Sequence, residues 1–324
     1  MKKRVFAVFA LIVLILFATG CKKQPDIVYV TRDELTGTEL SNSYEVNPPF
    51  FRVTDESTGA VVYMLGSMHV GKPEAVYPEK IVSALDECDT LAVELDSIAF
   101  QNDLRAAADA LSVLLCPSGT TAADLMGDDY DRIVRKFTEK GIYDPVYDKY
   151  IPSMWSSLWA NSWASECGYD SDYGTDFLLL SYSKGQGKKI DEIESAKEQY
   201  QMDANTSTEL QMLMLNSSLQ LTAEEAQAQF DELYNAWRTA DMATLTALAE
   251  EEESAELTEQ LAADYERYYD AMYTERQAKM ADYVRSKLQS GGKTFVVVGA
   301  MHYAAPPSIL DNLAEYGYTV EAPY

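Results

Sequence analysis

The chain has two histidines, and both stand in the same local pattern. An apolar, β-branched run at residues 61–65 leads into Gly66 and, three residues later, His69. A second such run at residues 294–298 leads in the same way into Gly299 and His302. Each run predicts a buried β-strand that ends at a glycine. If the two strands are neighbours, the two histidines meet at one edge of a sheet.

The residues after His69 predict a strand–helix–strand unit. An amphipathic helix pattern begins near Pro78, and residues 90–96 form the next strand-like run. Such a unit normally places its two strands side by side and parallel, with a right-handed crossover. His69 and Glu94 should then both lie at the carboxyl edge of the sheet, where open α/β folds bind their ligands.

The order of these patterns predicts the fold class and the division of the 324-residue chain. We expect an α/β fold of α+β-like character, with a small mixed sheet built from residues 50–97 and 293–324. A large, mostly helical insert occupies residues 98–292, apart from a short strand that ends near Glu194. The tryptophans at residues 155, 159 and 163 have helical spacing, which favours a buried helix over a cofactor site.

The first residues predict export and a lipid anchor. A basic start is followed by an apolar run from Val5 to Phe17, which is short for a membrane span and typical of a secretory signal. The run ends in small residues before Cys21 and resembles a bacterial lipobox. Residues 1–21 are therefore predicted to be a lipoprotein signal, and residues 22–49 a tether. We expect the protein on the outer face of the cytoplasmic membrane, held by lipid on Cys21.

Charge and cysteine content exclude some functions. The formal net charge of −26 argues against a nucleic-acid partner, because phosphate contacts require a basic surface. Besides Cys21 the chain has only Cys88, Cys116 and Cys167, which allow at most one disulfide among them. No two of these form a CxxC pair, so a thiolate metal site is not expected.

The two histidines and Glu94 together suggest a metal site. Two imidazoles and a carboxylate suit a divalent ion that keeps one position open for water. Such an ion lowers the pKa of its bound water and polarises a carbonyl group. Glu194 is the candidate for a general base. Taken singly, Glu194 and Arg276 are residue types more often found on a solvated surface.

The motifs resemble the TraB/GumN family, which is related to the Tiki proteins. Residues 66–71 and 91–96 are similar to its amino-terminal signature, and residues 298–302 to its closing GxxH motif. Residues 174–176, 187–189 and 193–195 resemble its middle block, and Glu275-Arg276 with Met280 a later helix. The similarity extends over about residues 50–321.

The resemblance implies a metal-dependent hydrolase, because Tiki members are proteases that act on secreted ligands. Carried over by motif, the metal centre comprises His69, Glu94 and His302, with Glu194 and Arg276 in support. The metal would be Mn, Co or Zn, and the substrate a peptide or a small molecule. Gln277 stands where the family favours asparagine, so the amide is one methylene longer.

Two other functions fit the same residues. One is a metal-free hydrolase, similar to the erythromycin esterases, in which a histidine is the general base. The other is a binding lipoprotein without catalysis, in which an aromatic cleft of the helical insert captures a ligand. The tyrosines available for such a cleft are Tyr265, Tyr268, Tyr269 and Tyr273, although their helical spacing also suits packing.

Overall fold

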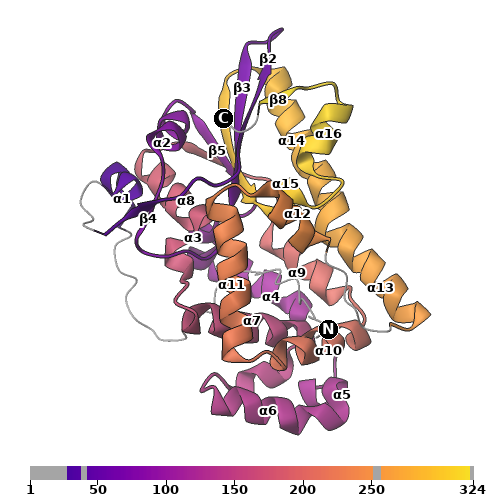
Figure 1. Cartoon of the computed structure of the whole chain (residues 1–324). Coiled ribbons are helices and arrows are strands. Elements are labelled where there is room, and N and C mark those ends of the chain that lie inside the picture. Colours follow the sequence, from indigo (N-terminus) through magenta and orange to yellow (C-terminus); the bar gives the residue numbers. More distant parts are fainter. Residues whose placement is uncertain (1–27, 38–41, 251–256, 322–324) are drawn as a thin grey trace.

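A computed structural model describes residues 28–37, 42–250 and 257–321 (Figure 1). The described residues form a six-stranded mixed sheet in the order β6-β5-β7-β3-β2-β8. A small parallel pair, β1 and β4, lies apart from it. The strands are β1 (Tyr44–Glu45), β2 (Phe50–Asp55), β3 (Ala60–Ser67), β4 (Ala75–Val76), β5 (Thr90–Val93), β6 (Lys189–Glu192), β7 (Lys293–Gly299) and β8 (Val320–Glu321).

Helices make up most of the remaining structure. They are α1 (Arg32–Thr36), α2 (Glu79–Asp86), α3 (Ser97–Asn102), α4 (Leu104–Leu111), α5 (Ala122–Met126), α6 (Tyr130–Glu139), α7 (Pro152–Glu166), α8 (Thr175–Gly185), α9 (Ala196–Ala204), α10 (Thr208–Leu219), α11 (Ala223–Arg238), α12 (Met242–Ala249), α13 (Glu259–Tyr269), α14 (Glu275–Ser290), α15 (Met301–Ala304) and α16 (Ile309–Glu315). In Figure 1 the sheet lies at the top, and α5, α6, α7 and α10 form the lower part of the molecule.

The two histidine strands are parallel neighbours, which is the condition under which the two histidines are expected to meet. Val62 of β3 pairs with Thr294 of β7, and the register continues to Ser67 opposite Gly299. Both strands are buried, and their side chains alternate between two hydrophobic clusters on opposite faces of the sheet. Burial on both faces explains the continuous apolar runs in the sequence.

The prediction that the strand at residues 90–96 lies beside the strand at residues 61–65 is wrong. β5 is parallel to β3, but β7 lies between them and pairs with both. Because β7 is the later of the three in the chain, a local strand–helix–strand pattern could not reveal this insertion. The consequence for the site survives, since all three strands end at the same edge.

Other sheet predictions are confirmed, with one change of extent. β2 and β3 form the hairpin that the turn-forming residues 55–59 predict, and β8 adds an edge strand to β2, as the short strand-like run at residues 318–321 indicates. β6 lies within the range predicted as a helical insert, yet it completes the opposite edge of the sheet by pairing with β5. The insert is therefore not separate from the sheet, because its short strand carries Glu194 to the sheet edge.

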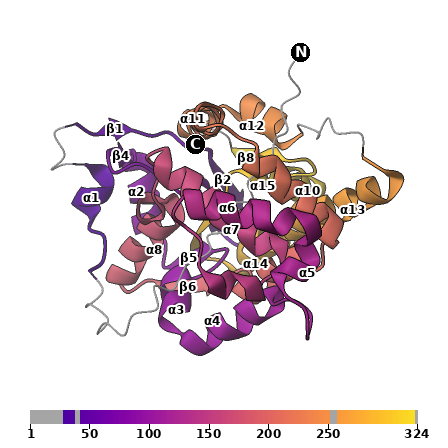
Figure 2. The same ribbon diagram turned by 90° about the horizontal axis from the view of Figure 1, so that it is seen from below.

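The tryptophan helix is part of the core, as its spacing predicted. Trp155, Trp159 and Trp163 of α7 are all buried. Trp155 lies against Phe137 of α6, with ring centroids 4.9 Å apart. The view from below shows α6 lying across α7 (Figure 2). This core stabilises the helical part of the chain.

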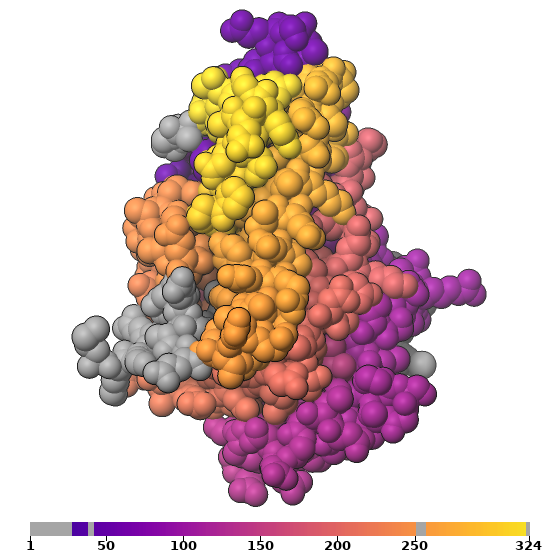
Figure 3. All heavy atoms as spheres, turned by 90° about the vertical axis from the view of Figure 1, so that its right-hand side faces the viewer, coloured from indigo at the N-terminus to yellow at the C-terminus, as the bar shows by residue number. Residues whose placement is uncertain are grey.

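A long helix joins the two parts of the molecule. α13 and α14 are continuous through a π-helical turn at Asp270–Thr274, in which the Glu275 amide donates to the Asp270 carbonyl five residues earlier. Figure 3 shows this helix running along one face, below the C-terminal residues. π-turns within α-helices are frequent at functional sites.

Part of the predicted tether is folded. Within residues 22–49, α1 buries Leu35 and β1 pairs with β4. The signal segment and Cys21 lie outside the described residues. In the part of the chain that the structure describes, no helix combines the length and apolarity needed to cross a bilayer. Cys88, Cys116 and Cys167 are free thiols.

Candidate functional site

The ends of β3 and β7 bring His69 and His302 to one place. The Gly299 amide donates to Oε1 of Glu94 at 2.6 Å. A methyl group placed on Gly299 would lie 3.3 Å from that Oε1, 3.7 Å from Cδ2 of His302 and 3.8 Å from Nε2 of His69. The three predicted metal ligands therefore converge around Gly299, where the absent side chain leaves room.

Arg276 links the two glutamates of the site. Its guanidinium donates to Oε2 of Glu94 at 2.6 Å and to both carboxylate oxygens of Glu194 at 2.8 Å. The amide of Gln199 also donates to both, at 3.2 Å to Glu94 and 3.0 Å to Glu194. The sequence-based preference for surface positions is wrong for Glu194 and Arg276, whose side chains are only 3% and 12% exposed.

The π-turn positions Arg276. The Met272 carbonyl lies inside this turn and accepts a hydrogen bond from Nη1 of Arg276 at 3.4 Å. Burial of a charge is costly unless it is paired and hydrogen-bonded. Here two carboxylates compensate the charge of the guanidinium. Burial alone would raise the pKa of Glu94, but the positive charge of Arg276 outweighs that effect. Arg276 and the nearby histidines lower the pKa of Glu94 to about 2.

Asp176 orients His69 and was not predicted as a site residue. Its Oδ2 lies 2.8 Å from Nδ1 of His69, and its Oδ1 accepts from the Ser67 hydroxyl at 2.7 Å. Burial opposes a charged imidazole, but Asp176 raises the pKa of His69 to about 9. The sequence Gly174-Thr175-Asp176 predicts a helix start capped by Thr175 or Asp176, and this prediction is wrong: no described side chain caps α8, and Asp176 faces His69 instead.

His302 has a different environment. Its side chain is 6% exposed, its Nε2 lies 3.8 Å from Oε1 of Glu94, and its buried Nδ1 has no hydrogen-bond partner among the described residues. The ring of Tyr273 packs edge-on against it, with centroids 5.9 Å apart. Burial and the positive charge of Arg276 lower the pKa of His302 to about 3. The imidazole is therefore neutral at physiological pH.

The donor chemistry of the site fits a divalent cation. Asp176, Glu94 and Glu194 carry three negative charges and Arg276 one positive charge, so two negative charges remain when both imidazoles are neutral. The carboxylate on Nδ1 of His69 leaves Nε2 available, the arrangement usual for a metal-bound histidine. His302 contributes a buried, unpartnered nitrogen. Among the described residues, however, no three candidate side chains are already gathered as a ligand set.

Several flanking residues have packing roles. Met68, which precedes His69 in the first motif, is buried in the core. Gln277 is fully buried and donates to the Ala305 carbonyl at 3.2 Å, so it supports the loop after α15 without reaching the centre. Sequence reasoning missed Asp176, Ser67 and Gln199. Asp176 lies within the middle block of the family motif, which was the one signal available for it.

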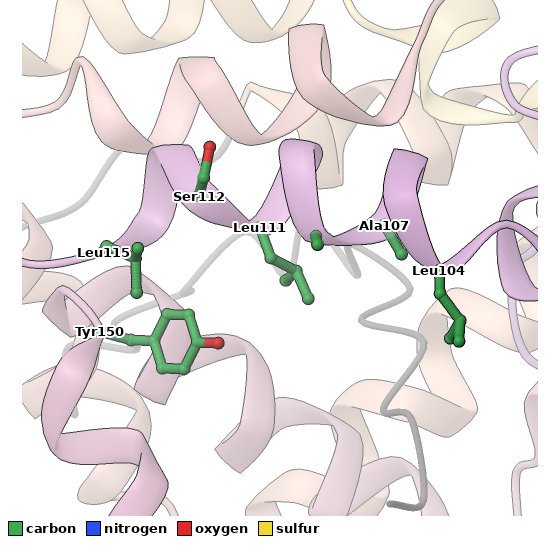
Figure 4. A pocket seen from close by; sticks show the side chains of 7 residues that line it. Leu104, Ala107, Leu111, Ser112, Leu115 and Tyr150 are labelled. Carbon is green, nitrogen blue, oxygen red and sulfur yellow. The ribbon is translucent and has the colours of Figure 1, made fainter.

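One groove on the described part of the chain lies away from this centre. It has a volume of about 250 Å³ and is lined mainly by apolar side chains of α4, with Tyr150 on the opposite side (Figure 4). It contains none of the histidines, glutamates or arginine described above. The groove is therefore separate from the polar residues gathered at the sheet edge.

Fold and site together define an α/β protein with a histidine–glutamate–arginine centre at the carboxyl edge of its sheet. The chain belongs to the TraB/PrgY/gumN family, whose sequence model matches residues 49–322. The comparisons with curated proteins and with solved structures gave no match. The family assignment confirms the resemblance that the two GxxH segments suggested.

Proposed function

We propose that the protein is a metal-dependent hydrolase that is anchored in the cell envelope by a lipid on Cys21. The convergence of His69, His302 and Glu94 around Gly299 is the observation that carries this proposal. These three residues would hold a divalent ion. When bound, such an ion, Mn²⁺, Co²⁺ or Zn²⁺, supplies an activated water and polarises a carbonyl group.

The other residues of the centre orient these three side chains and balance their charge. Asp176 fixes the ring of His69 through Nδ1, which keeps Nε2 directed toward Gly299. Arg276 holds Glu94 in place and offers a positive charge to an oxyanion that develops beside it. Glu194 binds Arg276 with both oxygens, so its proposed service as a general base requires that carboxylate to leave the guanidinium.

A peptide is the substrate class we propose, on the strength of the family resemblance. The test is metal content by elemental analysis of the chain lacking residues 1–21, after loading with each of the three ions. We expect about one ion per chain, lost in His69→Ala and His302→Ala, and peptidase activity that a chelator abolishes. Glu209→Gln, on the exposed surface of α10, is the control. If the parent protein holds no metal after loading with each ion, the metal centre is excluded.

A metal-free hydrolase is the alternative, and the bond between His69 and Asp176 favours it. A carboxylate on Nδ1 orients an imidazole and stabilises its protonated form, as in other hydrolases that use histidine as a base. This mechanism predicts hydrolysis that persists in chelator and falls by two or more orders of magnitude in Asp176→Asn. Chelator-sensitive hydrolysis would reject it.

A further inference from the structure

Asp203 of α9 is a buried acid that the chemistry above does not use. The residue is only 8% exposed. In the described ranges its carboxylate has no hydrogen-bond or ion-pair partner. The other buried acids all have partners: Glu94 and Glu194 bind Arg276, Asp96 binds Lys184, and Asp264 binds Arg267. An unpaired buried charge is costly, and a cation that reached this carboxylate would offset that cost.

The position of Asp203 connects it to the centre. Gln199 precedes it by four residues on α9, so the two side chains occupy the same helix face. The amide of Gln199 binds Glu94 and Glu194. Four residues of helix advance about 6 Å, so Asp203 lies roughly one turn beyond the carboxylates of the centre. A group of a substrate bound at Gly299 can span that separation.

Tyrosines surround the same place. The charge of Asp203 raises the pKa of Tyr200 on its own helix and of Tyr268 on α13, after the larger effect of burial. The charge of Arg276 acts on the phenol of Tyr268 in the opposite direction and lowers its pKa. Further along the same continuous helix, the rings of Tyr269 and Tyr273 are tilted against each other with centroids 4.9 Å apart, and Tyr273 contacts His302. Aromatic faces attract cations, and a desolvated cation gains most from them.

We propose that Asp203 and Tyr268 form a subsite for a cationic group of the substrate, an ammonium or a guanidinium. The subsite deepens the hydrolase proposal, because it names a basic residue near the bond that is cleaved. Burial raises the pKa of Asp203 to about 7, and a bound cation would restore the charge that burial disfavours. The net charge of −26 further favours the approach of positively charged ligands.

Binding of two matched probes tests the subsite without any need for hydrolysis. Nα-acetyl-arginine amide and its neutral isostere Nα-acetyl-citrulline amide are titrated into the whole chain at pH 8 by calorimetry. We expect the arginine probe to bind at least tenfold more tightly. Asp203→Asn should reduce this preference to about twofold, whereas Glu209→Gln removes the same charge from the exposed surface and should leave it unchanged. Equal binding of both probes by the parent protein would overturn the proposal.

Further variants separate a folding defect from loss of the subsite. Tyr268→Leu keeps Asp203 and should weaken the arginine probe severalfold without affecting the citrulline probe. His302→Ala should abolish hydrolysis and retain the arginine preference, so a failed hydrolase and a failed subsite give different results. Retention of the full preference in a folded Asp203→Asn protein would also refute the proposal.

Discussion

The two GxxH segments share a pattern but differ in their surroundings. Both follow parallel strands that pair in register. His69 lies in a loop after β3, with 30% of its side chain exposed and Asp176 bound to Nδ1. His302 lies in α15, with 6% exposed and no partner on Nδ1. The motif therefore fixes where each imidazole lies, and neighbouring side chains fix what it can do.

The contrast gives the two rings opposite protonation behaviour. The pKa of His69 is raised to about 9, and that of His302 is lowered to about 3. Pairs of titratable groups with pKa values pushed apart are typical of sites that need one acid and one base or ligand. Arg276 acts on both rings, and it lowers both pKa values.

Removal of Arg276 should have the largest effect, because it affects both segments. Arg276→Met leaves Glu94 and Glu194 buried without their counter-charge. We expect the free energy of unfolding to fall by about 3–5 kcal/mol, measured by urea denaturation. Arg285→Met is the control on the same helix, since Arg285 forms an exposed pair with Asp282 and should cost less than about 1 kcal/mol. Equal losses in the two variants would contradict this account of the centre.

Asp176→Asn should remove the difference between the two histidines. Without the carboxylate we expect the pKa of His69 to fall by about 2 units and that of His302 to stay low. NMR titration of the chelator-treated protein measures both, because the chain has only two histidines. A raised pKa of His69 that survives the substitution would show that Asp176 is not its cause.

The same substitution predicts a pH dependence of stability. The pKa of His69 is higher in the folded chain, about 9, than the ordinary value of 6.5. The stability from its charged form is therefore fully present below pH 6.5 and is lost as pH rises toward 9. Asp176→Asn should destabilise the protein most below pH 6.5, by about 2–3 kcal/mol, and least above pH 9. Urea denaturation across this range checks the sign.

Much of this site could be predicted from the sequence, because three of its side chains directly follow strands. Continuous apolar runs identified β3, β5 and β7, and strand ends placed His69, Glu94 and His302 at one edge. The neighbour order of β5 could not be predicted, since β7 comes about 200 residues later in the chain. Local patterns do not encode which distant strand inserts between two others.

Residues that act through tertiary contacts were harder to predict. Arg276 and Gln199 lie on helices whose sequences are rich in exposed acids and bases, so nothing local marks them as buried. The π-turn before Arg276 also lacks a sequence pattern of its own. Asp176 stands at a helix start, where an acid is expected as a cap, and that ordinary role hid its bond to His69.

Gly66 and Gly299, the glycines that open the two GxxH segments, should give the smallest difference in stability between the segments. A methyl group on Gly66 would lie 3.0 Å from the Cα atom of Ala300, against backbone that cannot easily move. Gly66→Ala should therefore cost about 1–3 kcal/mol of unfolding free energy. On Gly299 the nearest atom is a side-chain oxygen of Glu94 at 3.3 Å, so Gly299→Ala should cost less than about 1 kcal/mol.

The functional effects should run in the opposite order. Gly299→Ala fills the place where His69, His302 and Glu94 converge, so we expect loss of bound metal and of hydrolysis in a chain that remains folded. Gly66→Ala should retain its bound metal and its hydrolysis at urea concentrations below its lowered unfolding midpoint. Urea denaturation measures the stability of the two variants, and elemental analysis measures their bound metal. If Gly299→Ala kept its metal and its activity, the convergence at Gly299 would not be the functional centre.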